Sequence, residues 1–520
     1  MQHIPTNPLV SKADSAPNGF INITIGIAEI TSTLASIVVN GVQPPRMEKQ
    51  KIVVDFSSPN IAKEMHVGHL RSTIIGDSIC RTLEFCGHDV VRTNHVGDWG
   101  TQFGMLITYL KDEYPDILTN PPNITDLTKI YKAAKKRFDE DEEFKSRSRN
   151  NVVRLQAHDP ECTGIWQLLC DISRKEFQNV YDLLNVELTE VGESFYNPMI
   201  PEVIEGLQKQ KLITEEEAML IIKLAHFSIP LIARKSDGGY GYDSTDLAAV
   251  NYRIKDLKAN WIIYITDAGQ APHFYMVFDA AKAAGWVGTK KEPQQVRLDH
   301  IGFGVVCGDD GKRFKTRSSE TVKLIDLLNA AKDRMVKSLS DRAAEGKSSI
   351  EGEALEKAAA AVGYGAVKYF DLKQNPKTDY IFSYDRMLDT RGDSAVYLMF
   401  AYARLSSILT KASKERGIDL STLGDDVGAL DLKEESERAL AFELVQMGDT
   451  IKAVLAELMP CRVCDYLSSV CVKFTDFVTK CHVLNSEPDV MRSRLVLIEA
   501  TRKVMAKCFE LLGIEPLDKI

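Results

Sequence analysis

The sequence predicts an α/β protein in which a parallel sheet carrying a helical insertion is followed by an all-helical domain. Short apolar runs that end in polar loops, the pattern of strands buried in a parallel sheet, occur at 52–56 and 261–266, and a further strand is predicted at 89–94. Turns rich in glycine and polar residues follow these runs, and ligands of such sheets bind at the carboxyl ends of the strands. From about residue 388 onward the apolar spacing is only helical.

The same patterns divide the chain into parts. Residues 21–27 have the pattern of a strand and 28–39 that of an amphipathic helix, before a linker with two prolines. Long, charged helical patterns at about 111–210 indicate an insertion into the sheet domain. Strand signals return at 218–234 and at Gly302–Cys307, and a helix is expected at Thr321–Leu328. The predicted parts are residues 1–48, a catalytic domain at 49–345, a helical connector at 346–387 and a helical domain at 388–520.

Composition excludes several classes of protein. The chain has 520 residues, 44% hydrophobic and 26% charged, which is ordinary for a globular protein of a few domains. Its net charge of -9 means that any contact with nucleic acid must come from a local basic face. The apolar stretch at 21–42 contains too many polar residues for a membrane span, and the start has no signal pattern. The ten scattered cysteines indicate a reducing compartment.

The segment Lys51–Asp77 carries the most specific signal. A strand is followed by a polar turn, then by His66-Val67-Gly68-His69 at the expected start of a helix. A helix N-terminus offers unpaired N–H groups and a positive dipole end, which suit a phosphate. A histidine pair at such a place is more often a cap or a surface feature. The preceding strand, the glycine that lets a ligand approach and the nearby cation of Lys63 favour an ATP site instead.

A second segment contains the candidate binding residues Tyr242 and Asp246. They are four residues apart, so they share a face if the helix begins by Asp243. An aromatic ring beside a carboxylate suits a guanidinium or ammonium group, through stacking and charge-assisted hydrogen bonds. The simpler alternative is that Asp246 only caps a helix. Gln270 follows the strand at 261–266 and is placed where ligands bind.

Two further segments allow weaker hypotheses. The loop at 308–319 is rich in cations, including Lys315 and Arg317, and suits a triphosphate, although it contains no P-loop motif. An exposed basic loop is the alternative. Cys461 and Cys464, with two later cysteines, fit no common zinc spacing and fall in a helical stretch, so we expect apolar packing and no metal site.

Taken together, the motifs resemble those of arginyl-tRNA synthetases of the eukaryotic cytosolic, plant-like type. His66-Val67-Gly68-His69 resembles the HIGH signature of class I aminoacyl-tRNA synthetases. The segments 95–104, 236–249, 302–317 and 384–404 resemble the same family in the same order. The resemblance implies a Rossmann-like catalytic domain, a helical anticodon-binding domain at 388–520 and, at 1–48, a remnant of the α+β domain that contacts the tRNA elbow.

The resemblance also implies roles for single residues. ATP would be bound by His66, Gly68 and His69, with Lys63 and Lys315. The catalytic residues would be His66, His69, Lys63, Lys315 and Arg317. The arginine substrate would be held by Asp55, Asn60, His66, Tyr242, Asp246 and Gln270. Discriminating arginine from lysine requires carboxylates in a fork geometry, which this set provides.

The sequence departs from the family pattern in two places. The loop equivalent to the KMSKS signature reads Lys315-Thr316-Arg317-Ser318 and lacks the second lysine. In arginine enzymes of this kind a lysine just upstream of HIGH is thought to compensate, which here is Lys63. The N-terminal domain of such enzymes is represented only by its closing strand and helix at about 18–42, so we expect a truncated form or weakened elbow recognition.

The reaction implied is the activation of L-arginine with ATP and Mg²⁺, followed by transfer to tRNA(Arg), in cytoplasmic translation. We expect a monomer; membership of a multi-synthetase complex and an organellar form both stay open. Two alternatives also stay open. One is another nucleotidyltransferase with the HxGH motif, against which the helical C-terminal domain argues. The other is a catalytically inactive relative that binds tRNA or acts as a scaffold.

Overall fold

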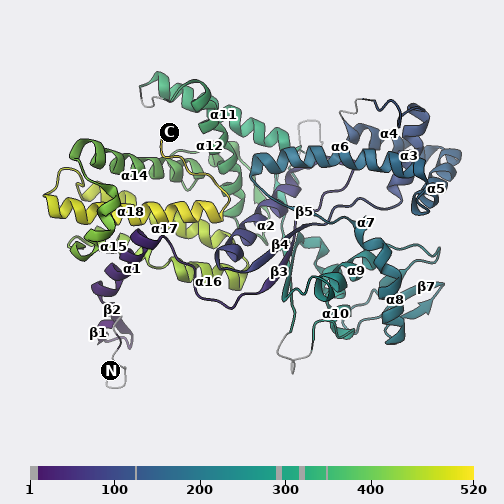
Figure 1. Cartoon of the computed structure of the whole chain (residues 1–520), viewed down its shortest axis with the longest axis horizontal. Coiled ribbons are helices and arrows are strands. Elements are labelled where there is room, and N and C mark those ends of the chain that lie inside the picture. Colours follow the sequence, from purple (N-terminus) through teal and green to yellow (C-terminus); the bar gives the residue numbers. More distant parts are fainter. Residues whose placement is uncertain (1–6, 8–9, 123–125, 289–294, 315–321, 347–349) are drawn as a thin grey trace.

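The centre of the molecule is a five-stranded parallel sheet, which confirms the predicted fold class (Figure 1). The computed structural model describes residues 7, 10–122, 126–288, 295–314, 322–346 and 350–520. The strands lie in the order β10-β9-β3-β4-β5, and all neighbours are parallel. Their bounds are Lys51–Asp55 (β3), Asp89–Asn94 (β4), Thr189–Glu190 (β5), Trp261–Asp267 (β9) and Arg297–Phe303 (β10).

Apolar residues alternate along β3 and β9 between two cores. Ile52, Val54 and Ile263 belong to the core that contains α2 (Val67–Phe85), whereas Val53 and Ile262 belong to the core that contains α9 (Tyr242–Lys255) and α10 (Ala271–Ala283). Both faces of the sheet are therefore covered, as continuous apolar runs in parallel strands indicate. The carboxyl ends of the strands are left as the place for a ligand.

Helices dominate the segment that was predicted as an insertion. They are α3 (Gln102–Glu113), α4 (Leu127–Glu140), α5 (Glu142–Gln156), α6 (Pro160–Leu184), α7 (Glu193–Tyr196), the 3₁₀ turn η1 (Asn197–Met199) and α8 (Ile200–Lys209). In Figure 1, α3–α6 extend from one side of the sheet. The segment also contributes β5, which pairs with β4 at the edge of the sheet. The sequence did not predict β5, because it consists of only two residues, which are polar and exposed.

The strand signals at 218–234 belong to a second, smaller sheet. It is antiparallel, with β6 (Thr214–Glu216), β7 (Met219–Ile222) and β8 (Leu231–Arg234). The chain then forms α9, β9, the 3₁₀ turn η2 (Ala268–Gln270) and α10. The helix that carries Tyr242 and Asp246 thus starts directly after this small sheet.

The strand predicted at Gly302–Cys307 was wrong in its bounds. The structure has β10 at Arg297–Phe303 and a separate β11 at Val306–Cys307, which pairs in parallel with β12 (Tyr380–Ile381). Polar residues at the start of β10 are partly exposed at the sheet edge, so the apolar pattern marks only its end. The helix expected from Thr321 is described from Leu324, as α11 (Leu324–Ala344); Thr321 lies outside the described residues.

Apart from β12, which lies within the predicted helical connector, the rest of the described chain is helical, as predicted. It contains α12 (Gly352–Leu372), α13 (Tyr384–Met387), α14 (Ala395–Arg416), η3 (Leu420–Ala429), α15 (Glu435–Leu444), α16 (Met447–Glu457), α17 (Cys461–Lys480) and α18 (Pro488–Leu511). At the N-terminal side, β1 (Val10–Ser15) and β2 (Ile21–Ile25) form a hairpin before α1 (Ile27–Asn40). Helix α1 packs on α18 and η3, so the two ends of the chain share a core.

A buried ion pair ties α2 to α12. Arg71 Nε lies 3.3 Å from an oxygen of Asp371, and both side chains are at most 1% exposed. Arg71 also donates to the carbonyl oxygens of Gly304 and Thr378, at 2.8 and 3.0 Å. Tyr380 donates to Asp371 at 2.7 Å. This network connects the helix that begins at the histidine pair with the end of α12, in the predicted connector.

The cysteines of this chain are packed as buried apolar residues. All ten cysteines are buried and unpaired, including Cys464 and Cys471 on α17. Over the ranges that the structure describes, no three histidine, cysteine or acidic side chains are grouped as metal ligands. Within those same ranges no helix is long and apolar enough to cross a membrane.

Candidate active site

One cavity lies at the carboxyl ends of β3, β9 and β10 and has a volume of about 760 Å³. Most of the residues predicted for ATP and arginine line it, although they come from distant parts of the sequence: Asp55, Asn60, His66, Gly68, His69, Tyr242, Asp246 and Gln270. Lys63 is not among its lining residues. Lys315 and Arg317 lie outside the described residues.

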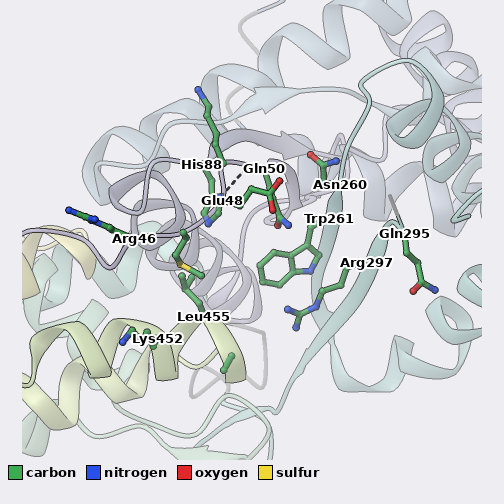
Figure 2. Close-up of a pocket in the computed structure, with 13 residues that line it drawn as sticks. Arg46, Glu48, Gln50, His88, Asn260, Trp261, Gln295, Arg297, Lys452 and Leu455 are labelled. Carbon is green, nitrogen blue, oxygen red and sulfur yellow. Dashed lines mark hydrogen bonds between the residues drawn. The ribbon is translucent and has the colours of Figure 1, made fainter. Parts of the chain in front are cut away.

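A second cavity, of about 720 Å³, lies at the opposite, amino ends of the strands. Figure 2 shows it between the linker before β3, the first residues of β9 and β10, and helix α16. The guanidinium of Arg297 lies 4.0 Å from the centre of the Trp261 ring and 2.5 Å from an oxygen of Asp299, so that cation already has partners. Because parallel sheets bind ligands at their carboxyl ends, the first cavity is the candidate active site.

The histidine pair caps α2. His66 is the N-cap residue, and its Nδ1 accepts a hydrogen bond of 3.0 Å from the backbone N–H of Gly68. His69 Nδ1 accepts one of 3.0 Å from the backbone N–H of His66. Each ring therefore keeps its proton on Nε2, which remains as a donor. The capping alternative and the ligand hypothesis are thus compatible, because each ring caps through one nitrogen only.

Both imidazoles are held neutral. Burial, with smaller contributions from His66 and Lys63, lowers the pKa of His69 to about 3, although the hydrogen bond from the backbone N–H of His66 acts in the opposite direction. Burial and the charge of Arg313 lower the pKa of His66 as well. The pair can therefore donate Nε2–H hydrogen bonds to phosphate oxygens but brings no positive charge to them.

Two glycines allow the close contacts at this end of the cavity. A Cβ on Gly68 would lie 2.8 Å from the ring of His66, and a Cβ on Gly97 would lie 2.2 Å from the side-chain oxygen of Asn60. Gly97 also pairs with the Asn60 segment through backbone hydrogen bonds, from its N–H to the Pro59 carbonyl and from the Ile61 N–H to its own carbonyl. Any side chain at these positions would displace His66 or Asn60 from the cavity.

Asp55 has a guanidinium partner within the chain itself. Arg253 places one nitrogen 2.7 Å from Asp55 Oδ2, and the arginine side chain is 0% exposed. Ser58 donates to the other oxygen at 3.2 Å, and His95 Nδ1 lies 3.8 Å from Oδ2. Asp55 lines the cavity, but much of its charge is already balanced by Arg253.

Tyr242 and Asp246 share the first turns of α9, as their spacing predicted. Tyr242 is the first helical residue and is 68% exposed, so Asp246, one turn later, is not the cap. Asp246 Oδ2 lies 2.7 Å from His273 Nε2, and Asp243 Oδ1 lies 3.3 Å from His273 Nδ1. Burial opposes a charge on His273, but the two carboxylates outweigh it and raise its pKa to about 9.

Glu193 is a further carboxylate in the same cavity. It is the first residue of α7, and its backbone N–H donates to the Val96 carbonyl. Burial, then the charges of Asp246 and Asp98, raise its pKa to about 8. Glu193 is thus mostly protonated at neutral pH.

Lys63 contacts the insertion, and its neighbours Glu64 and His66 contact Lys323. Lys63 Nζ lies 5.2 Å from the centre of the Tyr131 ring on α4. Lys323 Nζ lies 2.5 Å from Glu64, and the backbone of His66 bridges that of Lys323. The histidine segment is therefore attached directly to Lys323.

Several cavity residues were not predicted from the sequence. These are His95, Glu193, His273 and Arg313, together with Arg253 behind Asp55. His95 and Arg313 fall within the segments 95–104 and 302–317 that resemble the family, but no role was predicted for them. The other three lie in no such segment. The position of His273, three residues after Gln270, was the one signal among them, because it places an imidazole in the first turn of the helix that follows a strand end.

Comparisons with known proteins agree with this geometry. Residues 29–384 match the family described as tRNA synthetases class I (R), catalytic domain, and residues 398–520 match the DALR anticodon binding domain. The chain is 47% identical to an arginine–tRNA ligase, chloroplastic/mitochondrial, of Arabidopsis thaliana, over 100% of the chain and 80% of the relative. It is 46% identical to a cytoplasmic arginine–tRNA ligase of Xenopus tropicalis, over 100% and 79%.

Among solved structures, the chain is similar to the arginyl-tRNA synthetase of Plasmodium falciparum. The TM-score is 0.86 at 36% identity, and the match covers 99% of this chain and 87% of the other. The likeness therefore extends over the sheet domain and the helical domain together.

Proposed function

The chain belongs to the class I arginyl-tRNA synthetases, and we propose that it activates L-arginine with ATP and transfers the arginine to tRNA(Arg). The observation that carries this proposal is the single cavity that joins His66-Val67-Gly68-His69 to Tyr242 and Asp246. One end offers helix N–H groups and imidazole donors for phosphate. The other end offers carboxylates for a guanidinium.

Arginine is held, in this proposal, at the acidic end. Asp246 and Tyr242 receive the guanidinium, and Asn60 and Gln270 hold the amino acid backbone. Asp55 also attracts the guanidinium, but more weakly, because Arg253 already balances much of its charge. Since Asp246 keeps a lowered pKa, against burial and with His273 as its hydrogen-bond partner, it stays an anion at neutral pH. A carboxylate fork of this kind favours a planar guanidinium over the ammonium of lysine.

ATP is bound at the other end, with its α-phosphate beside His66, Gly68 and His69. An oxygen of the arginine carboxylate forms a bond to the α-phosphorus, the bond from that phosphorus to the bridging oxygen breaks, and pyrophosphate leaves. No general base is required, because the nucleophile is already an anion. The protein acts by positioning and by stabilising charge. Lys63, Lys315 and Arg317 supply positive charge to the phosphates.

Mg²⁺ enters this scheme with ATP as part of the substrate. Such an ion is usually held by phosphate oxygens, waters and one or two carboxylates, so it does not require a cage of protein ligands. In the second step a hydroxyl of the terminal ribose of tRNA(Arg), by class the 2′-OH, takes the arginyl group and AMP leaves. The helical domain reads the anticodon by stacking and hydrogen bonds to unpaired bases.

Arginine-dependent ATP–pyrophosphate exchange, measured with and without tRNA(Arg), tests the proposal. We expect exchange that depends on arginine and requires the tRNA. No exchange in either condition would favour the inactive, tRNA-binding alternative. Exchange that does not depend on arginine would favour a different nucleotidyltransferase.

We propose the cytoplasm as the compartment and a monomer as the working form. Relatives named as cytoplasmic and as chloroplastic/mitochondrial are about equally similar, so location must be measured with a fluorescent fusion of the full chain. Light scattering with size-exclusion chromatography measures the oligomeric state. A mass of two chains would contradict the monomer.

A further inference from the structure

His273 lines the candidate active site and lies between two carboxylates. Its Nε2 lies 2.7 Å from Asp246 Oδ2, and its Nδ1 lies 3.3 Å from Asp243 Oδ1. Both carboxylates belong to α9, whereas His273 belongs to the first turn of α10. A neutral imidazole has a proton on only one nitrogen, so carboxylates beside both nitrogens favour the imidazolium, which has a proton on each.

A positive charge at this place needs strong compensation. Burial opposes a charge on His273, and the positive end of the dipole of α10 repels a cation in the first turn of that helix. The two carboxylates outweigh the burial, since the pKa of His273 is raised to about 9. The imidazolium is therefore a cation of the protein itself at the end of the cavity that we assign to the guanidinium of arginine.

The ring is held from behind by Asp243. Asp243 is buried, and its Oδ2 accepts a hydrogen bond of 2.7 Å from the backbone N–H of Ile232 on β8. Its other oxygen faces His273, whose opposite nitrogen reaches Asp246. Among the residues that the structure describes, His273 is the one hydrogen-bond partner of the Asp246 side chain, so Asp246 Oδ1 is left for a ligand.

Glu193 shows how a carboxylate of the same cavity behaves without such a partner. It forms no ion pair within the described residues, and burial with the neighbouring negative charges raises its pKa to about 8. Burial acts on Asp246 in the same way, yet the pKa of Asp246 is lowered. The hydrogen bond with His273 is the largest cause of this lowering, with smaller contributions from His95 and Arg253.

We propose that His273 is a positioning residue for the recognition of arginine, which holds Asp246 ionised and in one orientation with Oδ1 free for a guanidinium N–H. This inference rests on the proposed function. His273 does not bind the substrate, because two cations repel each other; it acts through Asp246. Removing the imidazolium would not strengthen the attraction for arginine, because Asp246 would then take up a proton as Glu193 does.

The test compares His273→Asn with His273→Gln. The amide of glutamine can take the place of Nε2 beside Asp246, whereas that of asparagine can replace only Nδ1 beside Asp243. We expect His273→Asn to raise the KM for arginine about tenfold in ATP–pyrophosphate exchange with tRNA(Arg), the loss typical of one hydrogen bond to a charged group. His273→Gln should recover part of this loss. In both variants kcat and the KM for ATP should stay within about twofold.

The matched control is His300→Asn. The ring of His300 is also partly buried and stacks on that of Phe274, but it is hydrogen-bonded to Thr266 and does not line the cavity. This variant should resemble the wild type. A double variant tests the route of the effect: His273→Asn combined with Asp246→Asn should have a KM for arginine within about twofold of Asp246→Asn alone, because a residue that acts through Asp246 has nothing further to lose.

An unchanged KM for arginine in His273→Asn would overturn the inference. So would equal losses for arginine and ATP, fully additive effects in the double variant, or no recovery in His273→Gln. Equilibrium dialysis of labelled arginine against the full chain separates the inference from the proposed function. If the wild type binds arginine without exchange and His273→Asn binds it about tenfold more weakly, the proposed reaction fails and the inference is supported. No binding of arginine by the wild type would overturn both.

Discussion

Glu193 makes the binding of arginine dependent on pH in a defined direction. Its pKa is raised to about 8 by burial and by the negative charges of Asp246 and Asp98. We infer that Glu193 contacts the guanidinium together with Asp246, because both line the same cavity and Asp246 is close enough to raise the pKa of Glu193. A protonated carboxyl cannot form an ion pair with a guanidinium, so below pH 8 the binding of arginine then displaces a proton from Glu193. The affinity for arginine should therefore rise as the pH rises through 8 and level off once Glu193 is fully ionised.

The size of the effect follows from the fraction of Glu193 that is ionised. With a pKa of about 8, that fraction is about 3% at pH 6.5 and about one half at pH 8.0. The apparent dissociation constant is the intrinsic one divided by the competent fraction. The KM for arginine in ATP–pyrophosphate exchange with tRNA(Arg) should thus fall about fifteenfold between these two pH values.

The matched variant is Glu193→Gln, which keeps the shape of the side chain and cannot ionise. Its KM for arginine should be higher at pH 8.0 and nearly constant over the same range, and the KM for ATP should show no comparable change in either protein. A flat wild-type profile, or the same slope in Glu193→Gln, would refute the assignment of this titration to Glu193.

Three other substitutions test separate parts of the site. Asp246→Asn should raise the KM for arginine about ten- to a hundredfold and leave that for ATP within about twofold; equal effects on both would show that the arginine pocket lies elsewhere. Lys63→Ala should slow adenylate formation about tenfold or more in single turnovers with tRNA(Arg) and leave tRNA affinity unchanged, and a wild-type rate would discard its compensating role. Asp371→Asn should cost about 3–5 kcal/mol of folding free energy, read as a lower urea midpoint, because it leaves the buried Arg71 charge uncompensated. Its control, Asp139→Asn in the exposed pair with Lys135, should change stability by less than about 0.5 kcal/mol.

The parts of the fold that were predictable carry local patterns. β3 and β9 are mostly apolar runs, β4 contains the apolar pair Val90-Val91, and α2 starts where two histidines and a glycine interrupt the apolar spacing. β5 and β12 are two residues each and exist only because partner strands are brought beside them. The amino half of β10 was missed because its polar residues sit at an exposed edge.

The candidate site likewise contains residues that the sequence predicted and residues that only the fold brings together. His66, Gly68, Tyr242 and Asp246 belong to short motifs whose spacing survives in the sequence, and the cavity contains all four. Glu193, His273 and Arg253 are single residues on separate helices, and their chemistry depends on partners that only the fold brings near. The sequence also did not show that Asp55 is paired within the chain, since Arg253 is 198 positions away from it.

The most direct test of the central claim is the transfer of radiolabelled arginine to tRNA(Arg) by the purified chain with ATP and Mg²⁺. The cavity predicts ATP-dependent arginyl-tRNA in the wild type, almost none in Asp246→Asn at low arginine concentration, and no product when labelled lysine replaces arginine. No arginyl-tRNA from the wild type, or equal charging with lysine, would contradict a site in which one end binds ATP and the other recognises a guanidinium.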